Sequence, residues 1–417
     1  MRTGSPWGAS GFRTLFAGAA FSQFGVNVGY IAVPLIAVTA LGAGAGQVGV
    51  LSALSTVAFL VIGLPAGAWI DRMRHRRVLI AADLVRAALY LSIPVAWWLG
   101  VLTLGQLYAV VVLYGCATVF FDIASQSVLP QLVGRDRLVP ANSAVMTLIA
   151  LANIGGRGAG GAIVQFLTAP VAAASTAVAH LVAALRLSAL PPTPPPAAPA
   201  RRASLRAQIS EGVRHVFGVP ELRALALTAT FNNLGSQIVN TMLPIVFVRD
   251  LGYPAGTLGL FWMAGGAGLL AGARLARPLA VRLGPGRALV FAGPVMAPAA
   301  LLLPLVDRGA GLWLAGAGYF LAMAKTGMDN VLGVTLRQRM TPDPLLGRMN
   351  ATFRTLLTGA LALGAAAAGL IGELTAVRPA LWTGAIVLSL AFLPVTLSPL
   401  RSRGRSAHAP GEATAAR

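Results

Sequence analysis

Residues 21–35 read FSQFGVNVGYIAVPL, and residues 231–245 read FNNLGSQIVNTMLPI. Aligned at an offset of 210, the two stretches share Phe, Gly and Pro in register, and amide side chains match amide side chains. The further pairs at this offset are Gln23/Asn233, Asn27/Gln237, Gly49/Gly259, Arg72/Arg282, Arg77/Arg287 and Leu79/Leu289. An ungapped register that runs this far predicts that the chain consists of two copies of one unit.

The composition predicts that these units lie in a membrane. Of 417 residues, 56% are apolar and only 11% are charged, and the mean hydropathy is +0.75. Soluble domains carry about 25% charged residues, so this chain has too little charge to keep its apolar surface in water. A membrane-spanning helix needs about 20 apolar residues, and the length accommodates about twelve such helices with short loops.

Apolar runs bounded by charges, Pro or Gly define the predicted spans. They are residues 14–40, 46–70, 78–99, 104–127, 140–166, 169–190, 222–248, 257–280, 287–306, 311–335, 351–374 and 377–398. The first run is too long for the core of a signal peptide, so we expect it to remain as the first helix. The predicted fold class is therefore an all-α integral membrane protein with twelve transmembrane helices in two pseudo-symmetric halves.

Basic residues determine the predicted orientation. The chain has 32 Lys and Arg against 12 Asp and Glu, and the basic residues occur in small groups between apolar runs. This distribution argues against nucleic-acid binding, which would gather them on one face. With the N-terminus inside, the outer gaps hold only Arg249, Arg308 and Arg378. Because short cytoplasmic loops are enriched in Lys and Arg, both termini are predicted to be cytoplasmic, with the chain in a bacterial inner membrane.

The segment 191–221 interrupts the alternation of spans and short loops. It begins PPTPPPAAPARRASLR, which is too rich in Pro for a helix and too polar for lipid, so we expect an extended cytoplasmic linker. The predicted parts are an N-terminal half (1–190), this linker, a C-terminal half (222–398) and a disordered tail (399–417). Two repeated six-helix halves are typical of transporters that bind their substrate between the halves, near the middle of the membrane.

The loop after the second predicted span reads GAWIDRMRHRRVLI (67–80). Gly67 permits two helices to approach closely, and Asp71 can accept hydrogen bonds from the N–H groups at a facing helix end. The loop resembles the signature of the major facilitator superfamily, Gly-x-x-x-Asp-Arg-x-x-basic-basic. The resemblance implies an inner gate formed by Asp71 with Arg72, Arg76 and Arg77; His75 stands where the family pattern has a basic residue. Topology-setting charge, the alternative reading, does not explain Gly67 or Asp71.

Further segments resemble the subgroup that contains enterobactin exporters and macrolide efflux proteins. They are LIAADLVRA (79–87), FFDIASQSVLPQLV (120–133), LVPANS (138–143), SLRAQISEGVRHVF (204–217), PELRAL (220–225) and LRQRMTPDPLLGRMNATF (336–353). This resemblance implies export of a drug-like compound. It also implies that Asp122 pairs with an arginine of the 72–77 cluster at the inner gate; the alternative is an acid exposed to interfacial water.

The chain departs from the family pattern at two places. The fifth span reads GRGAGG (156–161), with Arg157 where antiporters of the superfamily have Pro. The first span has Val26 where members of the subgroup often carry an acid. A proton carrier in the first helix is therefore not expected.

Ionisable residues inside spans are functional candidates because lipid disfavours them. Lys325 and Asp329 lie four residues apart on one helical face, so they form either a proton-linked switch or a permanent ion pair. Arg157 is a candidate partner for an anionic substrate group or for Asp329, and the alternative is a charge used in helix packing. Glu373 is expected to be an interfacial anchor. His180 is expected to be a packing residue, and the alternative is a group that titrates at physiological pH.

Amide side chains form stripes on two predicted helices. Asn233, Gln237 and Asn240 follow a helical spacing in the seventh span, and Gln23, Asn27 and Tyr30 do so in the first. Such residues suit a cavity for a bulky, partly polar molecule. Hydrogen bonding between helices is the alternative explanation.

Other chemistries find little support in the sequence. No Gly-Lys-Ser/Thr phosphate loop and no Gly-x-Ser-x-Gly elbow occurs, and four His and one Cys lie far apart. We therefore expect no enzyme, no cofactor and no metal site. The leading hypothesis is a monomeric, proton-coupled exporter of a drug-like, macrolide or siderophore-type compound; the alternatives are an uptake symporter or a non-transporting receptor or scaffold with the same fold.

Overall fold

The computed structural model describes residues 5–70, 72–134, 137–191 and 205–401. The first half of the chain forms six long helices, of which the first ends in a π-helical turn. They are α1 (Ser10–Leu35) with η2 (Ile36–Ala40), α2 (Ala45–Ile70), α3 (His75–Trp98), α4 (Leu104–Val133), α5 (Leu138–Phe166) and α6 (Ala169–Ser188).

The second half of the chain has the same order of long helices. They are α8 (Pro220–Pro244) with η4 (Ile245–Asp250), α9 (Ala255–Leu283), α10 (Pro285–Met296) with η5 (Ala297–Leu305), α11 (Ala310–Arg339), α12 (Leu346–Leu374), and α13 (Val377–Leu390) with α14 (Leu393–Thr396). In η5 the helix narrows to 3-10 geometry, in a segment where closely spaced prolines remove N–H donors.

Ten helices of the described chain are long and apolar enough to cross a membrane. The helices α8 and α11 are also long, at 25 and 30 residues, but polar side chains such as Lys325 and Asp329 lower their hydropathy. With α8 and α11 included, the helices correspond one to one with the twelve predicted spans.

The sequence repeat produces a matching repeat of backbone geometry. The π-helical turns η2 and η4 follow Pro34 and Pro244, which are related by the offset of 210. Each turn leads to a glycine with positive φ, Gly42 at 64° and Gly252 at 62°. A Pro near a helix end removes one backbone N–H and favours a shift of hydrogen-bond register, so the same residues generate the same turn twice.

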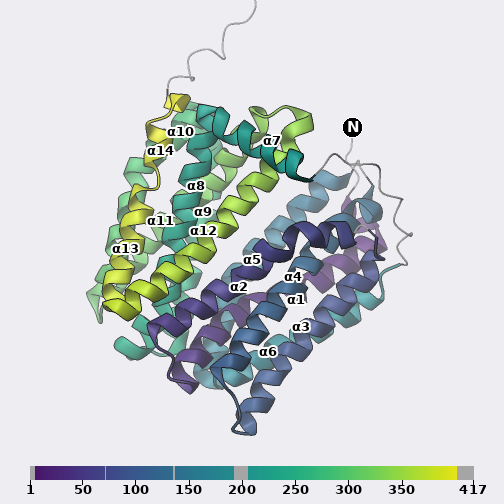
Figure 1. Cartoon of the computed structure of the whole chain (residues 1–417), viewed down its shortest axis with the longest axis vertical. Helices are drawn as coiled ribbons and strands as arrows, with labels where there is room; N and C mark the ends of the chain where they lie inside the picture. The colour runs from purple at the N-terminus through teal and green to yellow at the C-terminus, as the bar shows by residue number, and fades with distance from the viewer. Residues whose placement is uncertain (1–4, 71, 135–136, 192–204, 402–417) are drawn as a thin grey trace, which may run out of the picture.

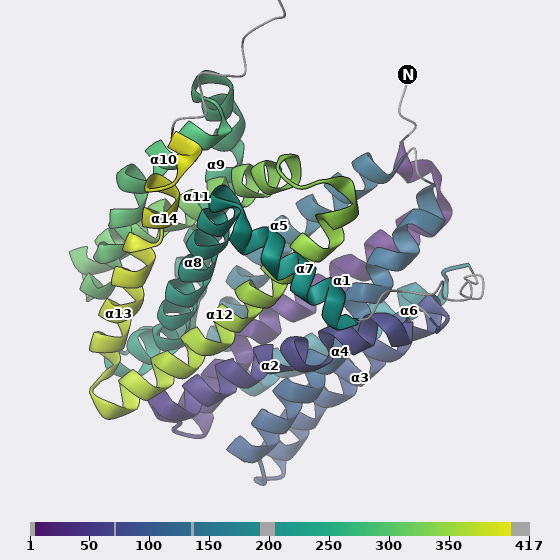
Figure 2. The same ribbon diagram turned by 45° about the horizontal axis from the view of Figure 1, so that its top comes forward.

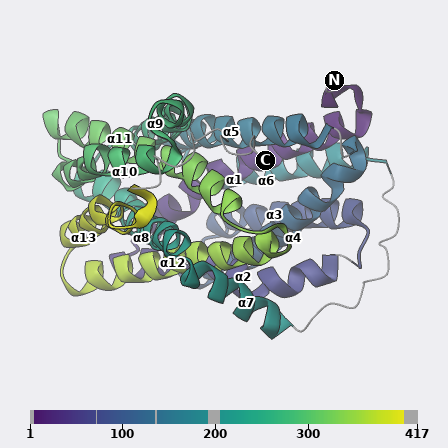
Figure 3. The ribbon, with the colours of Figure 1, turned by 90° about the horizontal axis from the view of Figure 1, so that it is seen from above.

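The helices form two groups that meet at one end of the molecule. Figure 1 shows α1–α6 on one side and α8–α13 on the other, diverging toward the end where α7 and the start of α1 lie. We call this the termini end and the opposite one the closed end. Seen from above in Figure 3, α9 lies beside α5, and α12 lies beside α2; these pairs make the main contacts between the groups.

The buried core follows the same division. At the closed end a single apolar cluster includes Leu35 and Leu51 of the first group and Leu258 and Ala368 of the second. Toward the termini end the core consists of two separate clusters, one in each group of helices. The two groups are therefore packed together at the closed end and apart at the termini end.

Glycines allow the closest contacts at the closed end. Gly49 of α2 faces Gly369 of α12, and Gly161 of α5 faces Gly259 of α9. A Cβ on Gly161 would lie 2.8 Å from the Cα of Gly259, closer than real side chains approach. Since Gly49 and Gly259 are equivalent in the repeat, each half uses the same glycine to contact the other.

Glu373 also joins the two groups at the closed end. Its Oε2 accepts a hydrogen bond from the backbone N of Gly46, at 3.0 Å, in the first turn of α2. A carboxylate is favourable at this position because the N-terminus of a helix carries partial positive charge. Glu373, which was predicted to be an interfacial anchor, therefore caps a helix of the other half.

The predicted extended linker (191–221) is wrong for its second part. Residues 205–218 form an amphipathic helix, α7 (Leu205–Gly218), with Val216 buried in the core cluster of the second group. Glu211 of α7 forms an ion pair with Arg348 of α12, and Figure 2 shows the two helices crossing at the termini end. The Pro-rich part, residues 192–204, and the predicted tail from residue 402 on lie outside the described residues.

Candidate transport site

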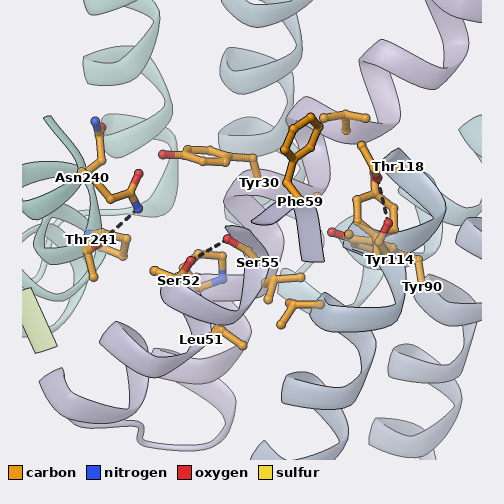
Figure 4. Close-up of a pocket in the computed structure, with 18 of the residues that line it drawn as sticks. Tyr30, Leu51, Ser52, Ser55, Phe59, Tyr90, Tyr114, Thr118, Asn240 and Thr241 are labelled. Atoms are coloured by element: carbon orange, nitrogen blue, oxygen red, sulfur yellow. Dashed lines mark hydrogen bonds between the residues drawn. The ribbon is translucent and has the colours of Figure 1, made fainter. Parts of the chain in front are cut away.

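A cavity of about 260 Å³ lies between the two groups of helices. Its wall comes from α1–α4 of the first group and from α8 and α9 of the second. The aromatic residues in this wall are Tyr30, Phe59, Tyr90, Tyr114 and Trp262, and the polar ones are Ser52, Ser55, Thr118, Gln237, Asn240 and Thr241. We call this space the central cavity; Figure 4 shows its side chains.

The central cavity is apolar with scattered neutral hydrogen-bonding groups. None of the described residues that line it carries a formal charge at neutral pH. Aromatic rings provide large flat contact surfaces, while hydroxyl and amide groups orient a ligand. The wall therefore suits a bulky, partly polar molecule.

Three of the six predicted cavity residues lie in this wall, namely Tyr30, Gln237 and Asn240. Asn240 Oδ1 accepts hydrogen bonds from Trp262 Nε1 at 2.8 Å and from the Tyr319 hydroxyl at 3.1 Å. These bonds fix the amide and connect α8, α9 and α11. Both explanations of the amide stripe therefore apply to Asn240, which lines the cavity and joins helices.

The other three predicted cavity residues lie elsewhere. Asn27 is buried, packs against Gly156 of α5 and donates to the backbone carbonyl oxygen of Gln23, so its amide serves helix packing; Gln23 is not part of the cavity wall. Asn233 lines a second cavity, of about 110 Å³, in the second group of helices. The stripe does not stay in one cavity because seven residues of α-helix rise about 10 Å.

The second cavity contains the predicted ion pair. Lys325 Nζ lies 2.5 Å from Asp329 Oδ2, and the lysine is only 3% exposed. Arg157, the predicted partner of Asp329, makes no ion pair with it in the described chain. The guanidinium of Arg157 instead lies 4.5 Å from the centre of the Tyr30 ring, so this charge stacks at the edge of the central cavity.

The predicted inner-gate residues are only partly visible. Asp71 lies outside the described part of the chain, and Gly67 lies near the C-terminal end of α2. Arg72 and Arg77 are exposed, and Arg76 donates to the backbone oxygen of Ser188 at the end of α6. The basic loop therefore contacts its own half at the termini end.

Asp122 does not form the predicted ion pair with an arginine of residues 72–77, as far as the described residues show. The cations that act on its carboxylate are Arg86 of α3 and Arg354 of α12. Arg354 comes from the opposite half and lies 3.9 Å from the centre of the Phe59 ring. Asp122 thus interacts with cations of both halves, Arg86 in its own half and Arg354 in the opposite one.

A buried polar cluster in the first half was not predicted from the sequence. Asp83 and Arg86 of α3 lie one helical turn apart with 3.0 Å between Arg86 Nη1 and Asp83 Oδ1, and Ser22 of α1 bonds to both. His180 of α6 bonds to Asp83 and to Tyr114. The sequence does contain a signal that could have predicted this cluster: an acid and an arginine lie three residues apart inside an apolar run, LIAADLVRA.

Repeated groups of membrane-length helices around a cavity that is closed at one end define a multi-pass membrane transporter. Residues 15–328 match the family model of the Major Facilitator Superfamily. The chain therefore belongs to the Major Facilitator Superfamily.

Two relatives resemble most of the chain. An uncharacterized MFS-type transporter, y4rN, of Sinorhizobium fredii is 27% identical over 336 residues, which are 78% of this chain and 79% of the relative. The enterobactin exporter EntS of Citrobacter koseri is 25% identical over 371 residues, or 87% and 85% of the two chains. The predicted resemblance to the subgroup of enterobactin exporters is confirmed at this low identity.

Solved structures show the same fold. The nucleoside transporter NupG matches with a TM-score of 0.73 at 14% identity, over 92% of this chain and 98% of NupG. A bacterial homologue of the iron transporter ferroportin in an inward-facing state matches with a TM-score of 0.70 at 16% identity, over 93% and 98% of the chains. Identities this low establish the architecture only.

Proposed function

We propose that the chain is a secondary active transporter that exports a bulky, partly polar compound by alternating access, with protons as the coupling ion. The observation that carries the proposal is the central cavity, which lies between two halves whose apolar cores join at the closed end. A rocking motion about this contact would expose the cavity to either side of the membrane in turn.

The orientation of the proposed transporter follows from the arginines of the short loops. The termini end carries Arg72, Arg74, Arg76 and Arg77, so it is proposed to face the cytoplasm. In this state the halves diverge on the cytoplasmic side, as an exporter requires for collecting its substrate. Closing this side is the role proposed for the inner-gate residues: Gly67, Asp71, Arg72, Arg76, Arg77 and Asp122.

The chemistry of the central cavity supports the proposed substrate class. Tyr30, Tyr114 and Trp262 offer ring faces, and Gln237 and Thr241 offer neutral polar groups, which suits macrolide- or siderophore-like compounds. Arg157, whose guanidinium lies 4.5 Å from the centre of the Tyr30 ring, is the cation that the sequence suggested for an anionic substrate group. The similarity to an enterobactin exporter supports the outward direction.

The proposed proton pathway in the second half includes Lys325 and Asp329. Their ion pair lies in the second cavity, and its lysine is almost completely buried. A proton bound to Asp329 would neutralise the carboxylate and release its hold on Lys325. Breaking the pair in this way would change the packing of α11 against α8.

Everted membrane vesicles provide the test. They are loaded with a pH-sensitive dye, energised, and exposed to macrolides, siderophores and aromatic dyes, with Asp329→Asn and the exposed-loop variant Asp307→Asn compared with the wild type. We expect compound-dependent proton release from the wild type and from Asp307→Asn, reduced at least tenfold in Asp329→Asn. Inserted, folded protein that gives no response to any compound would leave a receptor or scaffold as the better description.

A further inference from the structure

His180 lies at the centre of a chain of hydrogen bonds that ends at the central cavity. Its Nδ1 is 2.9 Å from Asp83 Oδ1, and its Nε2 is 3.0 Å from the hydroxyl of Tyr114. Asp83 and His180 are completely buried, whereas Tyr114 belongs to the cavity wall. Three helices, α3, α6 and α4, thus supply one continuous polar path from the interior of the first half to the cavity.

The surroundings of His180 contain one further charge of each sign. Arg86 bonds to the same oxygen of Asp83 as the imidazole does, at 3.0 Å, and lies 5.6 Å from the centre of the Tyr114 ring. Asp122, on α4, is a second acid that interacts with Arg86. From α1 the neighbours of the cluster are neutral: Ser22 bonds to Asp83, and Gly25 leaves space beside Nε2.

The charges in the cluster allow His180 to bind a proton. With a neutral imidazole, the charges of Asp83 and Arg86 cancel each other. Asp83 Oδ2 and Arg86 Nε are buried and have no hydrogen-bond partner among the residues that the structure describes, so one carboxylate oxygen remains uncommitted. A fully buried polar atom without a partner is costly, and a positive charge on His180 would stabilise this carboxylate.

We propose that His180 is a proton-binding site that is linked to the central cavity through the hydroxyl of Tyr114. This inference rests on the proposed transport function and assigns a proton site in the first half, distinct from Asp329 in the second. Figure 4 shows Tyr114 in the wall beside Tyr90 and Thr118.

The proton transfer requires no group that is absent from the cavity. A hydronium ion in the cavity gives a proton to the Tyr114 oxygen as the original hydroxyl proton passes to His180 Nε2. One O–H bond of hydronium and the original O–H bond of Tyr114 break, while a new O–H bond on Tyr114 and an N–H bond on His180 form, so water and imidazolium are the products and tyrosine stays neutral. Before the transfer, Tyr114 donates to His180; afterwards Nε2–H donates to Tyr114, whose hydroxyl proton turns toward the cavity.

This reversal links the proton to the substrate. A neutral His180 leaves Tyr114 as a hydrogen-bond acceptor toward the cavity, and a protonated His180 makes it a donor. A compound that binds better to one arrangement changes the affinity for the proton by the same factor, since linkage is reciprocal. Exchange of a compound for a proton requires this reciprocal effect of each ligand on the affinity for the other.

The first test observes the proton directly in full-length protein in lipid nanodiscs. Histidine labelled with 13C at Cε1 and tyrosine labelled at Cζ are titrated by NMR; the chain has only 4 His and 6 Tyr, and His180→Gln and Tyr114→Phe assign the two signals. We expect the His180 signal to titrate within the pH window in which the protein stays folded. The Tyr114 signal should shift with the same midpoint, while that of Tyr90, which lines the same cavity but has no hydrogen bond to His180, should not.

A His180 signal that does not titrate in this window, or that titrates while the Tyr114 signal stays constant, overturns the inference. Tyr114→Phe keeps the ring and tests the link even if His180→Gln does not fold: the His180 midpoint should then change, whereas Tyr90→Phe should leave it in place.

The vesicle assay distinguishes this inference from the proposed function. His180→Gln and Tyr114→Phe should each reduce compound-dependent proton release at least tenfold. Tyr108→Phe, on the same helix as Tyr114 but outside the cavity wall, should retain it. Wild-type proton release that both variants keep would overturn the role of His180 and leave the exporter proposal intact. Absence of proton release in the wild type would overturn proton coupling instead, and the NMR titration would still decide whether the site exists.

Discussion

Asn240 shows how one side chain connects the cavity wall to the helices behind it. Its carbonyl oxygen receives hydrogen bonds from Trp262 and Tyr319, which belong to α9 and α11. The orientation of the amide toward a ligand therefore depends on two residues that the sequence stripe did not include.

Replacing Trp262, which donates a hydrogen bond to the Asn240 amide, should weaken substrate binding. Trp262→Phe keeps an aromatic ring but removes the N–H that bonds to Asn240, a loss of about 1 kcal/mol or about fivefold in affinity. We expect KM for efflux to rise by about that factor with little change in the amount of folded protein. Trp313→Phe is the matched control because Trp313 is 80% exposed on α11; equal effects of the two substitutions would contradict the role of Trp262.

The ion pair of α11 should be a larger contributor to stability. Asp329→Asn leaves the buried Lys325 without a counter-charge, which typically costs about 3 kcal/mol. We expect a lower thermal unfolding midpoint in detergent, largely restored in the double variant Lys325→Met/Asp329→Leu, where no charge remains. A midpoint unaffected by Asp329→Asn would mean that water reaches Lys325.

The ability of the sequence to predict this site depended on distance along the chain. Tyr30, Gln237 and Asn240 were predicted because they follow helical spacing within single spans. The bond between His180 and Asp83 joins residues 97 positions apart, and no local pattern relates them. His180 consequently resembled an isolated packing residue, and only the packing of α6 against α3 gives it a charged partner.

The helices α5 and α9 cross at Gly161 and Gly259, where neither helix has a side chain between the two backbones. Gly161→Ala should push the helices apart at the closed end, because the new Cβ would meet the backbone of Gly259. Gly155→Ala on the same helix is the control, since a Cβ there meets nothing within 4 Å. Spin labels are placed on either side of the closed end in a Cys116→Ser background. The distribution of distances between them should broaden and shift to longer distances for Gly161→Ala only.

The helical elements were predictable to different degrees for physical reasons. The repeat in residues 21–35 and 231–245 predicted the two halves because equal sequences form equal turns at Pro34 and Pro244. Helix α7 was not predicted because the extended conformation expected for the Pro-rich start of the linker was assigned to the whole linker. The sequence from residue 205 on does contain an amphipathic pattern, in which Ile209 and Val216 lie seven residues apart on one helical face; Val216 is buried in the core and Ile209 is exposed.

For the molecule as a whole, the proposed inner gate makes a prediction about the balance of states. If the basic loop closes the termini end, Arg76→Ala and Arg77→Ala should increase the population with this end open, by about threefold for a loss of about 0.7 kcal/mol. Spin labels at Gln131 and Arg282, exposed positions in opposite halves, would report the distance. Arg13→Ala, an exposed arginine of α1 outside the gate, should leave the distribution unchanged, and a shift of equal size would contradict the gate.

The glycine crossing between α2 and α12 acts as a fulcrum with very unequal arms. Gly49 lies near the start of α2, so most of this 26-residue helix extends beyond the crossing toward the termini end. An arm of 21 residues is about 30 Å long, and a rotation of about 10° moves its far end by about 5 Å. A small rotation of the two helices about this glycine contact therefore moves the far end of α2 by about the width of a side chain, which widens the opening at the termini end.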